Sequence, residues 1–262
     1  MKNLLKPLRW VYSLYAFFCF VVIMLVLFPF SIIASFFGRI KGGNMVMRLC
    51  MVWADAWFFV IGIRHRKIFE APHDKKKPYI FVSNHISYLD AAMIPKAFRQ
   101  PVRPLGKVEM SKVPVFGFFY RNAIVTVDRS SAANRASSVR ILKSLISKGI
   151  SVMVFPEGTF NTGPKPLKEF YDGAFRVAIE TQTPVKPVLF LDAFRRMPYE
   201  GLFRMSPGRS RILYLEEIPV SGLTTADVPL LKEKVYRIME KKLVEYGGGR
   251  ESGVSSRESA SQ

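Results

Sequence analysis

The sequence predicts an α/β fold: a mostly parallel central sheet flanked by helices, preceded by an N-terminal membrane helix or a two-helix membrane motif. Beyond residue 78, short apolar runs alternate with helical patterns, which is typical of βα units and parallel sheets. The 262 residues are 49% hydrophobic, so a sizeable core can form. A long charge-free run near the N-terminus is too apolar for a solvated helix.

That charge-free run extends from Trp10 to Gly38. It exceeds the roughly 20 residues that cross a bilayer, and also the apolar region of a secretory signal, about 7 to 15 residues. A second apolar stretch, Leu49 to Ile63, is short and contains Asp55, so we expect an interfacial or partly inserted helix there. Residues 1–63 are therefore predicted to anchor the chain to a membrane, by a spanning helix or a re-entrant hairpin.

The remainder divides by composition into three parts. Residues 64–78 are polar and basic and are expected to form a linker, 79–246 the folded domain, and 247–262, small and polar, a disordered tail. Strands are expected at 79–83, 123–127, 151–155, 185–191 and 211–215, and helices at 91–98, 132–148, 173–181 and 229–246.

The net charge of +19, from 39 Lys and Arg against 20 Asp and Glu, indicates an acidic partner. Nucleic acid, anionic lipid, and an acidic protein or substrate would each fit. The apolar N-terminal segment favours lipid, and the arginines from Arg195 to Arg211 are expected to form a basic face toward headgroups. Because Cys19 and Cys50 both lie in apolar stretches, we expect neither a disulfide framework nor a Cys-ligated metal site.

The segment FVSNHISYLD places His85 directly after a predicted strand and Asp90 early in the next helix. In open α/β sheets the functional residues gather at the carboxyl ends of strands. An imidazole there, with a carboxylate on its other nitrogen, has the geometry of a general base. The same residues also fit a plain turn in which Ser87 or Asp90 caps the helix, and this segment alone leaves both interpretations open.

The predicted strand at 151–155 leads into a second candidate segment, FPEGTF. Gly158 permits a positive φ and could leave backbone N–H groups free to face an anion, while Glu157 could orient a substrate hydroxyl or a cation. A simple turn built on Pro and Gly is the alternative. Lys107 and Lys112, in a predicted loop, and Arg129, at a strand end, could hold a phosphate, although such cations are more often solvated surface charges.

Taken together and in order, five segments between Tyr79 and Pro187 resemble the blocks of the 1-acylglycerol-3-phosphate acyltransferase family. They are NHISYLD, KVEMSKVPVFG, AIVTVDR, FPEGT and TPVKPV. The resemblance implies transfer of a fatty acyl group from acyl-CoA or acyl carrier protein to the hydroxyl of a lysophospholipid, giving phosphatidate, at the cytoplasmic face of a membrane. It implies no cofactor and no metal, with residues 79–246 as the catalytic domain.

The resemblance also assigns roles to residues. His85 would deprotonate the acceptor hydroxyl and Asp90 would orient His85. The acceptor-binding residues it implies are Lys107, Arg129, Glu157, Gly158 and Thr159.

One departure from the family pattern concerns Phe160, because the third block commonly continues with arginine at that position. The missing cation leaves room for a second acceptor, another lysophospholipid or a lyso-aminolipid, with Lys165 or Lys168 as substitutes for the arginine. A third reading, a non-catalytic basic protein that binds membranes or nucleic acid, lacks a role for His85 and Asp90.

Overall fold

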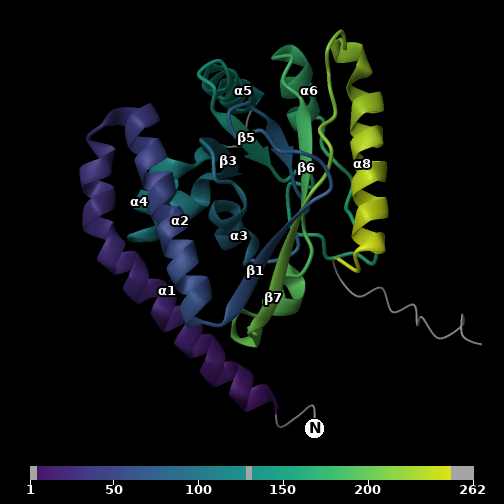
Figure 1. The fold of residues 1–262 in the computed structure, drawn as a ribbon. Helices are drawn as coiled ribbons and strands as arrows, with labels where there is room; N and C mark the ends of the chain where they lie inside the picture. The colour runs from purple at the N-terminus through teal and green to yellow at the C-terminus, as the bar shows by residue number, and fades with distance from the viewer. Residues whose placement is uncertain (1–4, 128–131, 249–262) are drawn as a thin grey trace, which may run out of the picture.

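The computed structural model describes residues 5–127 and 132–248 (Figure 1). A seven-stranded sheet in the order β1-β7-β6-β2-β5-β3-β4 forms its centre. Every neighbouring pair of these strands is parallel except β6 and β7, which confirms the predicted α/β fold. The strands are β1 (Ile63–Phe69), β2 (Ile80–Val82), β3 (Val102–Lys107), β4 (Val125–Val127), β5 (Ser151–Val154), β6 (Val185–Phe190) and β7 (Gly208–Tyr214).

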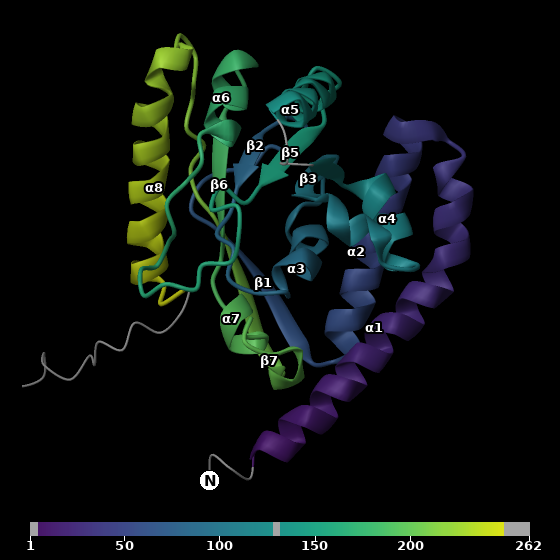
Figure 2. The same ribbon diagram turned by 180° about the vertical axis from the view of Figure 1, so that it is seen from behind.

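Helices cover both faces of the sheet (Figures 1 and 2). The α-helices are α1 (Leu5–Ser35), α2 (Gly43–Val60), α3 (Asp90–Ala97), α4 (Phe116–Ala123), α5 (Ala132–Ile146), α6 (Gly173–Glu180), α7 (Ala193–Arg196) and α8 (Val228–Glu245). A π-helical turn η1 (Gly38–Gly42) joins α1 to α2, and short 3-10 helices are η2 (Val108–Lys112), η3 (Leu202–Arg204) and η4 (Thr225–Asp227).

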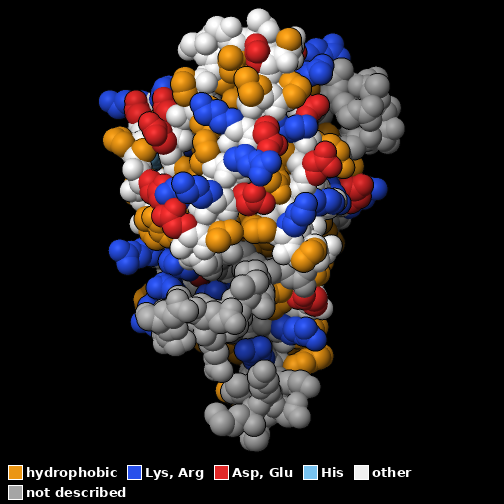
Figure 3. All heavy atoms as spheres, turned by 90° about the vertical axis from the view of Figure 1, so that its right-hand side faces the viewer, with side chains coloured by type: hydrophobic (Ala, Val, Ile, Leu, Met, Phe, Trp, Pro, Cys, Tyr) orange, Lys and Arg blue, Asp and Glu red, His pale blue; other side chains and the backbone are white. Residues whose placement is uncertain are grey.

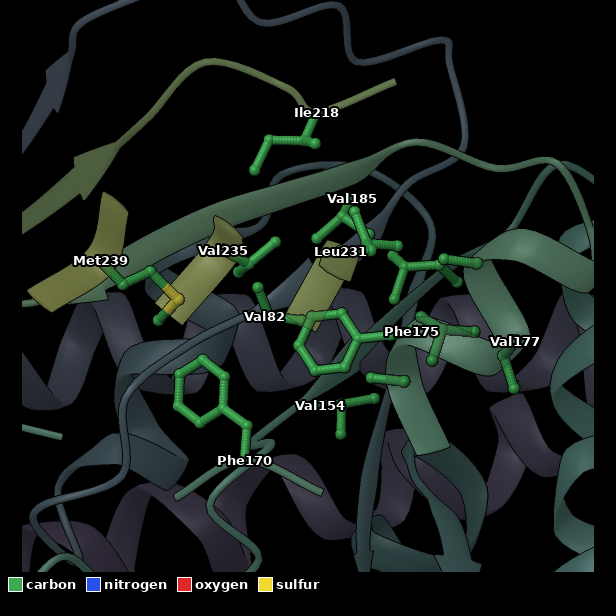
Figure 4. Close-up of a cluster of buried hydrophobic side chains, with 14 of the residues drawn as sticks. Val82, Val154, Phe170, Phe175, Val177, Val185, Ile218, Leu231, Val235 and Met239 are labelled. Carbon is green, nitrogen blue, oxygen red and sulfur yellow. The ribbon is translucent and has the colours of Figure 1, made fainter. Parts of the chain in front are cut away.

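The core lies in two layers because side chains alternate across each strand. Ile80 and Val82 of β2 contribute to the cluster under α5, α6 and α8, whereas Phe81 contributes to the cluster under α1 to α4. Figure 4 shows part of the first cluster, in which side chains of α8 lie over the strands. The central strands β2, β5 and β6 are buried along their whole length, as parallel strands covered on both faces must be.

The two apolar N-terminal segments form a helical hairpin. Within the described residues one helix, Pro7–Ser35, is long and apolar enough to cross a membrane, and only 11% of its most apolar part is buried inside the protein. The inner face of α1 is nevertheless docked, since Trp57 Nε1 donates to Ala16 O at 2.8 Å and Trp53 Nε1 to Phe20 O at 3.2 Å. The other face of α2 packs on α3 and α4, so α1 lies along the domain (Figure 2).

Two strands were missed in the sequence. The predicted linker is wrong for its first residues, because Ile63–Phe69 forms β1 and pairs with β7. Because β1 is an edge strand, it carries exposed Arg and Lys side chains, and this polar composition led to the prediction of a linker. Strand β3 contains Pro104 and Gly106, which normally argue against a strand; at Gly106 a Cβ would come within 2.0 Å of Tyr120 Oη.

The other elements follow the sequence closely. The five predicted strands correspond to β2, β4, β5, β6 and β7, and the four predicted helices to α3, α5, α6 and α8. Helix α4 was not expected. Most of the predicted tail lies outside the described residues, and the remaining domain limits stay predictions.

Neighbouring leucines of α8 provide a test of the core. Leu231 is 3% exposed and Leu230 is 70% exposed. Leu231→Ala should lower the free energy of unfolding by about 2–5 kcal/mol, because it removes buried methyl groups and leaves a cavity. Leu230→Ala, the same substitution one residue earlier on the same helix, should change it by less than about 0.5 kcal/mol. Urea unfolding of the full chain in detergent measures both, and equal effects would contradict the described orientation of α8.

Candidate active site

His85 and Asp90 meet where β2 leads into α3. His85 Nδ1 lies 2.9 Å from Asp90 Oδ2, and the same oxygen accepts the backbone N–H groups of Ile86 at 2.8 Å and Ser87 at 3.0 Å. The Asp90 side chain is fully buried, whereas that of His85 is 22% exposed. The carboxylate therefore holds both the turn and the imidazole, whereas the alternative of a side-chain cap is not formed, because Leu89 is the N-cap residue of α3 and no side chain caps the helix.

This geometry fixes the tautomer of the imidazole. An ionised carboxylate only accepts hydrogen bonds, so Nδ1 of His85 carries the proton that points to Asp90. The lone pair of Nε2 is then available to a proton donor. Ser87 reinforces the turn, since its hydroxyl accepts from Leu89 N–H at 2.9 Å and donates to Met197 O at 2.5 Å.

Glu157 contacts the backbone of His85 and is buried away from solvent. It is fully buried; Oε1 accepts the backbone N–H of His85 and Oε2 that of Lys168, each at 2.8 Å. Burial raises the pKa of the Glu157 carboxyl to about 7, opposed by these two N–H donors. Because its side chain is fully buried, Glu157 faces the backbone of His85 and does not face a substrate hydroxyl.

Asn84 ties the end of β2 to the end of β6. Its Nδ2 donates to Phe190 O at 3.1 Å, and its Oδ1 accepts Phe190 N–H at 2.8 Å. This contact was not predicted from the sequence. A polar residue that closes a fully apolar strand, just before the histidine, is the signal that could have indicated it, because buried amides need partners.

The FPEGT turn differs in one detail from the expectation. Gly158 has φ of +72°, as predicted, but its N–H donates to Phe155 O at 3.0 Å and so closes the turn, where we expected it to face an anion. Thr159 is exposed and its hydroxyl accepts a hydrogen bond from Lys168 Nζ at 2.8 Å. The cation beside this turn is thus Lys168.

Aromatic rings surround the imidazole. The ring of Phe155 stacks on His85 with centroids 4.0 Å apart, and Phe160 meets it at 4.4 Å with an interplanar angle of 64°. Tyr88 packs edge-on against Phe160 at 4.9 Å. Phe160 therefore lines an apolar wall beside the base. The sequence indicated no such wall, because Phe155 and Phe160 reach His85 only through the sheet order.

Of the remaining predicted cations, Lys107 is exposed at the carboxyl end of β3, and β5 lies between β3 and β2. Arg129 lies outside the described residues. The predicted basic face is wrong for Arg211, whose guanidinium is held by both oxygens of Asp192 at 2.8 and 2.9 Å.

No group of three or more His, Cys, Asp or Glu side chains in the described parts of the chain could hold a metal ion. The absence of a cofactor and a metal stays a prediction.

Comparison with known proteins gives consistent results. A family model described as acyltransferase matches residues 63–191. The human 1-acyl-sn-glycerol-3-phosphate acyltransferase alpha is 26% identical over 77% of this chain and 70% of its own length. The 1-acyl-sn-glycerol-3-phosphate acyltransferase of Haemophilus influenzae is 28% identical over 71% of this chain and 76% of its own length.

A solved structure shares the fold. The crystal structure of the 1-acyl-sn-glycerophosphate acyltransferase PlsC from Thermotoga maritima superimposes with a TM-score of 0.71 at 22% identity, covering 92% of this chain and 97% of that one. The likeness extends into the N-terminal hairpin, because the uncovered 8% of this chain is shorter than the hairpin.

The position of Glu157 predicts a pH-dependent effect. A carboxyl whose pKa is raised from 4.5 to about 7 stabilises the fold below pH 4.5, and this contribution is lost as the pH rises through 7. Glu157→Gln does not titrate. The stability of the wild type relative to this variant should therefore fall by up to about 3 kcal/mol between pH 4.5 and 7.5. Thermal unfolding of both proteins across this range measures the difference, and a constant difference would contradict the raised pKa.

Proposed function

The chain belongs to the acyltransferase family, and we propose that it transfers a fatty acyl group from acyl-CoA or acyl carrier protein to the free hydroxyl of 1-acylglycerol-3-phosphate, giving phosphatidate. The observation that carries the proposal is the contact between His85 and the buried Asp90, which leaves Nε2 as the free proton acceptor. The named relatives supply the substrate class.

The reaction follows from this geometry. Nε2 of His85 takes the hydroxyl proton as the acceptor oxygen attacks the thioester carbonyl, and Asp90 stabilises the imidazolium that forms. The new C–O bond forms as the C–S bond breaks, and the departing thiolate takes the proton back from His85. A thioester is already activated, so this route needs no metal, cofactor or covalent enzyme intermediate.

The aromatic wall assists this proton transfer. A ring stacked at 4.0 Å attracts an imidazolium through its π face, and Phe155 is so placed. Phe155 and Phe160 also exclude water from the base, which limits hydrolysis of the thioester. Glu157 holds the backbone of His85 while this charge forms.

We further propose that the hairpin attaches the protein to one membrane surface, with the catalytic domain in the cytoplasm. The outward face of α1 exposes large apolar side chains, while its inward face is docked on α2. The first turns of α1 reach the edge of the sheet that carries His85, where Trp10 stacks on Phe203 at 4.6 Å and Ser13 Oγ accepts Met205 N–H at 3.0 Å. A lipid acceptor would enter along this edge.

Two observations bear on the acceptor. Lys168, hydrogen-bonded to Thr159, supplies a cation beside the site and favours the phosphomonoester of lysophosphatidate. Phe160, which packs on His85 where the family pattern has arginine, favours a second candidate acceptor, another lysophospholipid or a lyso-aminolipid. Activity of the purified protein on a panel of these acceptors, with acyl-CoA and acyl carrier protein as donors, decides between them.

Replacement of the base tests the mechanism. His85→Ala should lower kcat for acylation of lysophosphatidate by about 10²–10⁴-fold, the usual contribution of a general base. His73→Ala is a matched control, because His73 lies outside the site, near Tyr79 and Tyr214. Initial rates per mole of folded protein in detergent measure both. Wild-type activity in His85→Ala, or equal losses in the two variants, would contradict the assignment.

The cation beside the FPEGT turn tests the acceptor. Lys168→Ala should reduce kcat/KM for lysophosphatidate about tenfold or more, because a charge-assisted contact to phosphate is worth about 1.5–3 kcal/mol. The uncharged acceptor monoacylglycerol should show little change. Lys165→Ala tests the other lysine that the sequence offers as a substitute, and Lys241→Ala, at an exposed position of α8, serves as control. If Lys168→Ala leaves lysophosphatidate acylation unaffected, this lysine is not the phosphate contact.

A further inference from the structure

Apart from the site at His85, the structure contains a strongly basic pocket at the opposite edge of the sheet. Its volume is about 660 Å³, and it opens between the hairpin turn η1, the end of α4 and helix α5. No Asp or Glu lines it in the described parts of the chain. The basic residues that line it are Arg39, Arg103, Arg121, Arg140 and Lys148.

The pocket is separate from the acyl-transfer site because it lies at the other edge of the sheet. Arg103 is near the start of β3 and Val125 begins β4, so both mark the amino ends of parallel strands. His85 follows the carboxyl end of β2, which is parallel to β5 and, through it, to β3. Figures 1 and 2 show the hairpin turn and α5 at the same end of the molecule.

Arg103 makes this pocket unusual. It is 3% exposed, and within the described residues its guanidinium donates to neutral carbonyls alone, those of Val102 at 3.0 Å, Ile40 at 3.2 Å and Arg39 at 3.4 Å. A Cβ at Gly43 would come within 2.5 Å of Arg103 Nη2, so the hairpin is built around this group. Burial lowers the pKa of Arg103 to about 10, so it remains charged at neutral pH.

Arg103 has no carboxylate partner in the parts of the chain that the structure describes, and a buried cation of this kind gains free energy from an anion nearby. Four further cations, on Arg39, Arg121, Arg140 and Lys148, converge on the adjacent pocket. The face formed by α8, in contrast, mixes basic and acidic side chains (Figure 3). The charge of the pocket is therefore a local feature and does not simply repeat the basic composition of the chain.

We propose that this pocket binds the phosphate of an anionic phospholipid headgroup. The position of the pocket favours lipid over a soluble anion, because the adjoining end of the hairpin exposes Phe36 by 83% and Phe37 by 56%. Exposed aromatic rings beside cations are typical of a segment at headgroup depth. This inference rests on the proposed attachment of α1 to a membrane surface and adds a lipid site distinct from the one for the acceptor.

Native mass spectrometry of the full chain in detergent, titrated with dioleoylphosphatidylglycerol or dioleoylphosphatidylcholine, tests the proposal. Wild type should bind the anionic lipid more tightly. The double variant Arg140→Gln/Lys148→Gln should bind it roughly 25-fold more weakly at low ionic strength, about fivefold for each cation removed. Arg103 is left intact, because it also holds the hairpin turn.

The matched control is Lys234→Gln/Lys241→Gln on the exposed face of α8, which removes the same charge elsewhere. It should bind phosphatidylglycerol as the wild type does. Equal weakening in both double variants, or none in the pocket variant, would overturn the proposal. So would displacement of phosphatidylglycerol by coenzyme A from wild type, because the pocket would then hold a soluble phosphate.

Lipid binding here is separable from acyl transfer. His85→Ala should bind phosphatidylglycerol like wild type, and the pocket variant should keep its acyl-transfer rate in detergent. Loss of catalysis with intact lipid binding would therefore leave the pocket assignment standing, and the reverse result would leave the catalytic assignment standing.

Discussion

The site depends on one buried oxygen, Oδ2 of Asp90, which accepts three hydrogen bonds from consecutive residues: the His85 ring and the N–H groups of Ile86 and Ser87. A second buried carboxylate, Glu157, accepts the backbone N–H of His85. His85, the proposed base, is thus held at its ring by the carboxyl group of Asp90 and at its backbone by that of Glu157, and the two groups follow different strands. Such preorganisation costs nothing at the moment of reaction, because the groups are already in place.

The order of the strands makes this arrangement possible. Strand β2 lies between β5 and β6, so the chain leaves the sheet at three adjacent points on one edge. Asn84 bonds to the end of β6, and Glu157, just after β5, bonds to His85. If β2 lay at an edge of the sheet it would have only one neighbouring strand, and one of these two contacts would be lost. The apolar strands that build the core therefore also set the geometry of the turn that carries His85.

Features that depend on residues close in sequence could be predicted, whereas contacts between residues that only the sheet brings together could not. The pairing of His85 with Asp90 spans five residues, so their spacing made the contact possible, and the ordered blocks of the family resemblance favoured it over a plain turn. Glu157 lies 72 residues from His85, and nothing local distinguished a carboxylate that faces substrate from one that is buried beneath the base. Strand β1 was missed for a related reason, since an edge strand carries charges that look like a linker, and its partner β7 is distant in sequence.

The hairpin joins the two ends of the molecule. The first turns of α1 contact η3, near the edge that carries His85, whereas its last turn leads to the basic pocket at the opposite edge. The helix from Pro7 to Ser35 has 29 residues, so these ends are about 43 Å apart. A helix standing across the bilayer would separate them by the full membrane thickness. A helix lying in the surface, as we propose, would instead place the acceptor site and the basic pocket at the same membrane face.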